Sequence, residues 1–342
     1  MNDFLKYEGS VYSYESSDIH SYNMILVGSM HGNELPCSIL LMNIIARINR
    51  DEVLQKFIKN NFKRLIIIPF INKNGIRNRS RDNAWFGNNQ NDAFADYSAR
   101  QLIMGHIDSI VNTTEFKNNN DAKLVVLDFH NSYCCCDSIV YDPYDDPIRV
   151  AFIDRIIYEV TKSQDRAFHK VFAPIKYRND LETLKYYVNN VIANMPGIGN
   201  NKVLGCTIER AGMANSIAQW SFEYIDTNFF IELIKLITKN LRIYNSKFHT
   251  NFKEKVNYAI SANITANCSG LLEWVVPVGC IIEKDEAICK IRSIDGYDKY
   301  RILDEIKAPY KGYVVAHVDT FYVNYGDSFG IFNAAEPLIT PT

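Results

Sequence analysis

Three apolar runs without polar alternation stand out in the first 130 residues, at 23–30, 64–71 and 123–130. Such runs are typical of strands that are buried on both faces of a sheet. Between the first two, residues 35–59 show helical spacing of apolar positions at Leu40, Ile44, Ile48 and Phe57. Strand, helix and strand in this order predict a βαβ unit, so the sheet is at least partly parallel.

The remaining patterns extend this α/β arrangement through residue 252. Helical spacing recurs at 98–116, 148–162, 182–195 and 227–245, and a short strand is predicted at 205–210. The polar and aromatic residues 1–22 suggest an edge strand, and the polar segment 72–97 suggests an ordered loop anchored by Trp85 and Phe86. We therefore predict a mixed, mostly parallel sheet flanked by helices over residues 1–252.

The pattern changes after about residue 252 to short strands separated by glycine-containing turns. Two stretches, 270–288 and 312–329, form an internal near-repeat. Residues 253–342 are therefore predicted to form a small all-β domain, and their pattern resembles the barrel-sandwich module of biotinyl and lipoyl carriers. In those carriers a lysine at a hairpin tip is modified. Lys307 lies near the corresponding place, and we expect it to be an ordinary surface lysine.

Composition and charge argue against nucleic-acid-binding, membrane-spanning and secreted classes of protein. The chain has 342 residues, a net charge of -2 and no basic stripe, which argues against a nucleic-acid partner. No run approaches the roughly 20 apolar residues of a membrane helix, and the first 15 residues lack the apolar core of a secretory signal. We expect a cytoplasmic protein whose eight cysteines, including the consecutive Cys134 to Cys136, are free thiols.

Candidate metal ligands follow the predicted strands. His31 and Glu34 come after the first strand, His130 ends the third, and Glu209 lies at the end of 205–210. Carboxyl ends of parallel strands gather at one edge of a sheet, where ligands bind. Two histidines and a carboxylate suit a zinc site with an open position, and a fourth carboxylate could take a proton from water. Singly, each has an ordinary alternative: His130 could cap a strand, and Glu209 could pair with Arg210.

The motifs His31-Gly32-Asn33-Glu34, Asp128-Phe129-His130 and Thr207-Ile208-Glu209 resemble those of the zinc carboxypeptidase superfamily, and most closely its succinylglutamate desuccinylase/aspartoacylase branch. The resemblance covers roughly residues 20–250. It implies one Zn²⁺ held by His31, Glu34 and His130, with Glu209 as the general base. Asp128 could orient a ligand histidine or be an ordinary strand-end aspartate.

The same resemblance assigns roles within the polar segment. Arg81 matches the arginine that polarises the scissile carbonyl, and Asn91 matches the asparagine that binds the substrate carboxylate. Asp92 stands where the branch has an arginine that clamps this carboxylate. Either another arginine supplies the missing charge, or Asp92 meets an amine on a cationic or zwitterionic substrate. The candidates for such an arginine are Arg77, Arg79, Arg178 and Arg210.

These residues predict a zinc-dependent amidohydrolase that removes the acyl group from a small N-acyl amino acid or a related acylated amine. A carboxypeptidase or amidopeptidase acting on short peptides such as cell-wall fragments is the second hypothesis. A non-catalytic binding module on the same fold is the third. The expected partner is a small molecule or short peptide, not a nucleic acid or a membrane, and a homo-oligomer is left open.

Overall fold

The computed structural model describes fifteen segments of the chain. They are residues 4–17, 22–32, 34–78, 97–132, 138–141, 152–153, 155–156, 159–160, 169–172, 202–211, 227–241, 261–277, 280–294, 301–317 and 322–334. Among these residues no helix is long and apolar enough to cross a membrane. The predicted helix 182–195, the anchors Trp85 and Phe86, and the domain boundary at 252/253 lie outside the described residues.

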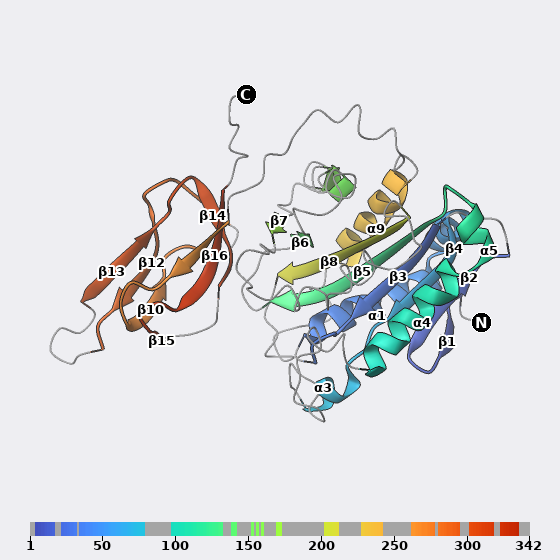
Figure 1. The fold of residues 1–342 in the computed structure, drawn as a ribbon, viewed down its shortest axis with the longest axis horizontal. Helices are drawn as coiled ribbons and strands as arrows, with labels where there is room; N and C mark the ends of the chain where they lie inside the picture. Colours follow the sequence, from blue (N-terminus) through green and yellow to red (C-terminus); the bar gives the residue numbers. More distant parts are fainter. Residues whose placement is uncertain are drawn as a thin grey trace.

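An eight-stranded sheet, in the order β1-β2-β4-β3-β5-β8-β6-β7, forms the centre of the larger part of the chain (Figure 1). Its parallel core consists of β4 (Phe62–Ile68), β3 (Tyr22–Gly28), β5 (Lys123–Ser132) and β8 (Val203–Ala211). The edges are β1 (Lys6–Glu8), β2 (Val11–Glu15), β6 (Ser138–Tyr141) and β7 (His169–Phe172), and antiparallel pairing joins β2 to β4 and β6 to β8. The predicted mixed, mostly parallel sheet and the N-terminal edge strand are confirmed.

Apolar side chains on both faces of this sheet explain the unbroken apolar runs. One face packs against α1 (Leu35–Arg50), α2 (Glu52–Asn61) and α9 (Thr227–Leu241), where Phe129 of β5 meets Phe230 of α9 with ring centroids 6.0 Å apart. The other face packs against α4 (Tyr97–Val111) and α5 (Thr114–Asn118). Described residues between 152 and 160 are helical, as predicted for 148–162.

Two predicted helices are each interrupted, which corrects the sequence interpretation. The stretch 35–59 forms α1 and α2, because the Asp51 side chain accepts hydrogen bonds from the amides of Val53 and Leu54 and so starts a new helix. The stretch 98–116 likewise divides into α4 and α5, where Thr113 accepts from the Phe116 amide at 3.2 Å. Apolar spacing alone did not reveal either break, because both helices of each pair pack their apolar side chains against the same face of the sheet.

The loop predicted for residues 72–97 is wrong at its beginning. Residues Lys73–Asn78 form the short helix α3 rather than a loop. The Asn72 side chain accepts a hydrogen bond from the Gly75 amide at 2.8 Å, so it satisfies a donor in the first turn. Local hydrogen bonding, rather than apolar periodicity, determines this helix.

The C-terminal strands form two further four-stranded sheets, in the orders β13-β12-β10-β15 and β11-β14-β16-β9, around a separate apolar core (Figure 1). Their bounds are β9 Ser261–Thr265, β10 Gly270–Trp274, β11 Ile281–Ile282, β12 Ala287–Arg292, β13 Ile302–Lys307, β14 Gly312–His317, β15 Tyr322–Val323 and β16 Ser328–Ala334. The predicted all-β part is therefore present in the structure.

The near-repeat in the sequence corresponds to a structural repeat. If each strand of the first sheet is shifted by four places along the eight strands β9 to β16, with the count returning to β9 after β16, its order becomes β9-β16-β14-β11, the second sheet read in reverse. Equivalent turns carry Asp285 and Gly326, both with positive φ (68° and 87°), whose amides donate to the carbonyls of Ala308 and Ala266 at 2.9 and 2.8 Å. Lys307 ends β13, where its ammonium group lies 3.6 Å from Glu305.

Candidate metal centre

The turn after β3 places His31 and Glu34 at the carboxyl edge of the sheet. Ser29 adopts a positive φ of 52° immediately after the strand, and the Glu34 amide donates to the His31 carbonyl at 3.1 Å before α1 begins. This tight turn brings the two side chains together, with His31 Nδ1 and Glu34 Oε1 2.7 Å apart. A histidine and a glutamate three residues apart therefore act as one unit here.

The segment after β4 holds this turn in place. The Asn72 backbone amide donates to the Ser29 carbonyl at 3.2 Å, and its side-chain nitrogen donates to the Met30 carbonyl, also at 3.2 Å. Gly32 packs directly against Gly75 of α3, because a Cβ atom on Gly32 would lie 2.0 Å from the Gly75 carbonyl carbon. Glycine at position 32 is thus required by the close approach of α3.

His130 comes to the same point from β5, the strand beside β3. Its Nδ1 atom lies 2.9 Å from Glu34 Oε2, so the carboxylate joins the two imidazoles, whose ring centroids are 4.9 Å apart. All three side chains are buried, with exposed fractions of 1% for His31, 3% for Glu34 and 2% for His130. One ligand atom from each lies within 4.8 Å of the others, which makes them a group that could hold a metal ion.

Asp128 determines which nitrogen of His130 faces the centre. Its Oδ2 atom lies 2.9 Å from His130 Nε2, on the side of the ring away from Glu34. Asp128 and His130 are two residues apart in β5, so their side chains lie on the same face of the sheet. An acidic partner of this kind fixes the ring and makes the opposite nitrogen a better metal ligand. The structure therefore favours the orienting role of Asp128 over that of an ordinary strand-end aspartate.

The buried carboxylates and imidazoles shift one another's pKa values. Burial by itself would raise the pKa of Glu34, but His130 and His31 outweigh burial and lower this pKa far below its ordinary value. Burial would similarly lower the pKa of His130, whereas the carboxylates of Asp128 and Glu34 raise it well above its ordinary value. Without a metal, the structure therefore places a His130 cation between two carboxylates.

The donor set fits zinc. Imidazole nitrogen and carboxylate oxygen are zinc ligands, and three protein ligands leave a coordination position open, as in catalytic zinc sites. Two histidines also disfavour the hard cations Mg²⁺ and Ca²⁺, which prefer oxygen ligands. The free-energy cost of burying this charged group is high unless a cation balances it, since burial of unpaired charge is unfavourable.

Glu209 is placed beside this group by strand register. β8 runs parallel to β5, and Glu209 is the direct partner of His130 in the ladder. Neighbouring strands lie about 4.8 Å apart, so its backbone is next to the centre. The side chains of Glu209 and Arg210 are outside what the structure describes, as are residues Arg81, Asn91 and Asp92 in their entirety.

Sequence reasoning missed two neighbours of the centre. The Cys37 thiol of α1 donates to the His130 carbonyl at 2.9 Å. The backbone amide of Asn131 donates to Glu34 Oε2 at 3.2 Å, and the Asn131 side chain is buried. Only the position of Asn131 directly after a candidate ligand could have indicated its importance. Five of the eight cysteines lie within the described residues and form no disulfide bond, as predicted: Cys37, Cys206, Cys268, Cys280 and Cys289. Cys134 to Cys136 lie outside the described residues.

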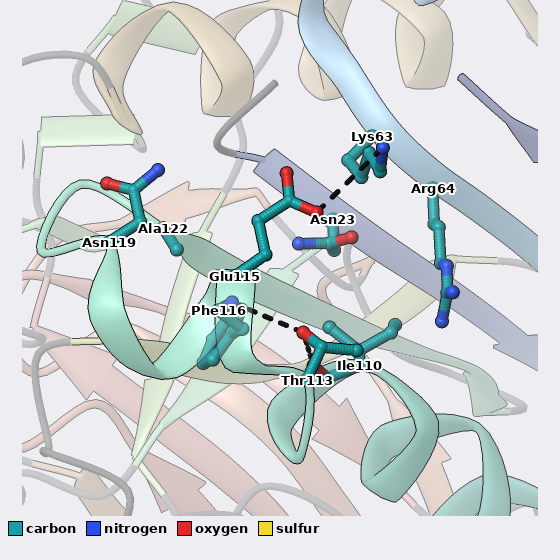
Figure 2. Close-up of a pocket in the computed structure, with 9 residues that line it drawn as sticks. All are labelled: Asn23, Lys63, Arg64, Ile110, Thr113, Glu115, Phe116, Asn119 and Ala122. Atoms are coloured by element: carbon teal, nitrogen blue, oxygen red, sulfur yellow. Dashed lines mark hydrogen bonds and ion pairs between the residues drawn. The ribbon is translucent and has the colours of Figure 1, made fainter. Parts of the chain in front are cut away.

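A pocket at the opposite edge of the sheet does not belong to this centre. It lies at the amino ends of β3 and β4, where Lys63 and Glu115 approach each other at 3.9 Å across it (Figure 2). The Thr113 hydroxyl, which also lines it, accepts the Phe116 amide and caps α5 (Figure 2). Lys63, Glu115 and Thr113 thus interact with other groups of the protein, so we assign no ligand to this pocket.

The chain was compared with protein-family models, with curated protein sequences and with solved structures. No protein-family model matches the chain, and no curated protein matches it in sequence. Solved structures do match. An aspartoacylase family protein from Mesorhizobium loti has a TM-score of 0.60 and 17% identity, and covers 96% of this chain and 89% of its own. The chain therefore shares the fold of this aspartoacylase family protein.

Two further solved structures share this fold. A succinylglutamate desuccinylase/aspartoacylase from Rhodobacter sphaeroides has a TM-score of 0.61 at 17% identity, covering 95% of this chain and 88% of its own. A metallo-carboxypeptidase from Burkholderia cenocepacia has a TM-score of 0.50 at 14% identity and covers 69% of this chain and 61% of its own. The zinc carboxypeptidase-like fold predicted from the motifs is confirmed, and the aspartoacylase-like structures match over nearly the whole chain, including the C-terminal sandwich.

Proposed function

We propose that the protein is a zinc-dependent hydrolase that cleaves the amide bond of a small N-acyl amino acid or a related acylated amine. The observation that carries this proposal is the buried group of His31, Glu34 and His130 at the carboxyl edge of the sheet. Its setting in a fold shared with desuccinylase and aspartoacylase family proteins supports the reaction class.

His31, Glu34 and His130 would hold the zinc ion, with Asp128 orienting His130. When bound, zinc would polarise the substrate carbonyl and lower the pKa of a water molecule to about 7. Deep burial of the three ligands keeps competing water away from their donor atoms and strengthens their electrostatic effect.

Glu209 would act as the general base. Its backbone position beside His130 in the ladder supports this role. It would take the proton of the attacking water and pass it to the departing nitrogen as the carbon–nitrogen bond breaks, which yields a carboxylic acid and an amine. We propose that Arg81 stabilises the negative charge on the carbonyl oxygen and that Asn91 and Asp92 contact the substrate beyond the scissile bond.

The test combines metal content with a conservative substitution. We expect about one zinc per chain in purified protein, and Glu209→Gln should retain zinc while losing at least about a hundredfold in kcat, since general base catalysis contributes this much. Glu305→Gln, on the distant sandwich, is the matched control and should keep full activity. Protein that binds no zinc, or a Glu209→Gln variant with full activity, would contradict the proposal.

A panel of substrates decides between the enzyme alternatives. We expect N-acyl amino acids and acylated amines to be hydrolysed faster than short peptides, because the aspartoacylase-like structures cover 95–96% of the chain and the metallo-carboxypeptidase only 69%. Faster hydrolysis of peptides would favour the peptidase alternative. Zinc binding without turnover of any member would favour a non-catalytic binding module.

A further inference from the structure

The strand β1 forms one edge of the eight-stranded sheet (Figure 1). In the described part of the chain it pairs with β2 alone. All three of its residues are exposed, and Tyr7 has an exposed fraction of 61%. An edge strand presents unpaired backbone N–H and C=O groups, to which a strand of another chain can add.

The register of the β1–β2 hairpin determines which backbone groups face the open side. Glu8 pairs with Val11 across the two-residue turn Gly9–Ser10, so these two residues exchange the hydrogen bonds that close the hairpin. Hydrogen-bonded and non-hydrogen-bonded pairs alternate along an antiparallel ladder, so Tyr7 and Tyr12 form a non-hydrogen-bonded pair. The backbone N–H and C=O of Tyr7 therefore point away from β2, to the open side of the sheet.

Side chains of β1 divide between the two faces of the sheet. Tyr7 lies on one face, where its ring contacts that of Tyr12 with ring centroids 4.8 Å apart. Lys6 and Glu8 lie on the other face, and neither forms an ion pair within the described part of the chain. The edge thus presents one cation and one anion, on either side of an outward-facing backbone pair.

We propose that β1 pairs with the β1 strand of a second copy of this chain, antiparallel and centred on Tyr7, so that the protein forms a homodimer. In this register the two Tyr7 residues exchange backbone hydrogen bonds. Lys6 of each copy lies opposite Glu8 of the other, in the pair geometry that brings side chains closest. The two-fold symmetry of such a dimer makes both ion pairs identical.

The charges select this partner and this register. Charged side chains on an edge strand oppose pairing with most other strands, and like charges placed directly opposite each other are unfavourable. A parallel copy would place Lys6 opposite Lys6, whereas an antiparallel copy centred on Tyr7 places opposite charges together at both positions.

The outward-facing residues on either side of Tyr7 are less suitable as centres of the pairing. Leu5 is 1% exposed, and its N–H already donates to Asn49 Oδ1 at 3.1 Å. Gly9 belongs to the turn and has a positive φ of 58°. Tyr7 is therefore the position at which a second strand can add.

Charge reversals test the partner and the register together. The pairing involves three residues on each side, and small interfaces give weak complexes, so we expect a wild-type dimer at roughly 100 μM protein in analytical ultracentrifugation. Lys6→Glu places glutamates opposite each other and Glu8→Lys places lysines opposite each other, so each variant alone should be monomeric. An equimolar mixture of the two variants restores opposite charges in both pairs and should form a heterodimer. Lys56→Glu, at an exposed position of α2, is the matched control for net charge and should leave the dimer intact.

A backbone substitution tests the strand pairing itself. Tyr7→Pro removes the outward N–H, and proline is tolerated on an edge strand where the N–H faces solvent. This variant should keep its circular dichroism spectrum and be monomeric. Tyr7→Thr also lacks the ring but keeps the N–H, and should dimerise more tightly than Tyr7→Pro.

Three results would overturn the proposal. The wild type could be monomeric at this concentration. Its dimer could survive Lys6→Glu and Tyr7→Pro, which would place the interface on another surface. The mixture of the two charge variants could stay monomeric, which would exclude the antiparallel register. Because β2 and β4 separate β1 from β3, all variants should retain the zinc content of the wild type.

Discussion

Asp128 provides the most direct test of the candidate metal centre. Its Oδ2 atom lies 2.9 Å from His130 Nε2, and the side chains of both residues are only 2% exposed. A hydrogen bond to a charged group contributes about 1.5–3 kcal/mol when the pair is buried, and a tenfold change in affinity corresponds to about 1.4 kcal/mol. Removing Asp128 should therefore weaken zinc binding by roughly 10- to 100-fold, the usual range for partners that orient a ligand.

An opposing effect has to be weighed. Asp128 raises the pKa of His130 in the metal-free protein. The imidazole therefore binds its proton more tightly, and this proton competes with zinc for the same ring. Zinc carries twice the charge of a proton, so the carboxylate favours the metal more than its competitor. The net effect of losing Asp128 is still weaker binding, and it should be largest above the pKa of His130.

The assay is a zinc titration against a competing chelator. Asp128→Ala should show the full loss, and Asp128→Asn a smaller one, since an amide oxygen can still accept the His130 N–H without its charge. Asp121→Ala, on the loop before β5, controls for general loss of surface charge. Unchanged zinc affinity in Asp128→Ala would refute the orienting role of Asp128.

Further predictions concern the turn and the charges. Gly32→Ala should lower stability by about 1–3 kcal/mol and reduce zinc content, because the new Cβ would lie 2.0 Å from Gly75; an unchanged melting temperature would contradict this packing. In metal-free protein, the stabilisation from Glu34 should be complete above its ordinary pKa of 4.5 and be lost below it. That from His130 should be complete below 6.5 and be lost as pH rises through its raised pKa. Unfolding measured from about pH 3 to 9 should thus show a maximum between 4.5 and 6.5, and zinc should abolish the alkaline loss.

Much of the fold follows from local sequence alone. Apolar runs such as 64–71 are long enough to be recognised as buried strands, and the near-repeat of 270–288 and 312–329 corresponds to the repeated strand order of the sandwich. The breaks at Asp51 and Thr113 were missed, because a capping side chain interrupts the backbone without disturbing the apolar spacing. Helix α3 was missed for a related reason, since Asn72 starts it within a polar stretch.

The sequence by itself determined the candidate ligands, because His31, Glu34 and His130 have the residue types that zinc requires and follow predicted strands. Only the tertiary structure decided their environment. Parallel pairing of β3 with β5 brings residues about a hundred positions apart into one buried group. The carboxylates of Asp128 and Glu34, brought to His130 by this packing, then raise the pKa of His130 well above its ordinary value. Burial and long-range hydrogen bonding depend on how segments that are distant in the sequence pack together, and local sequence patterns do not predict that packing.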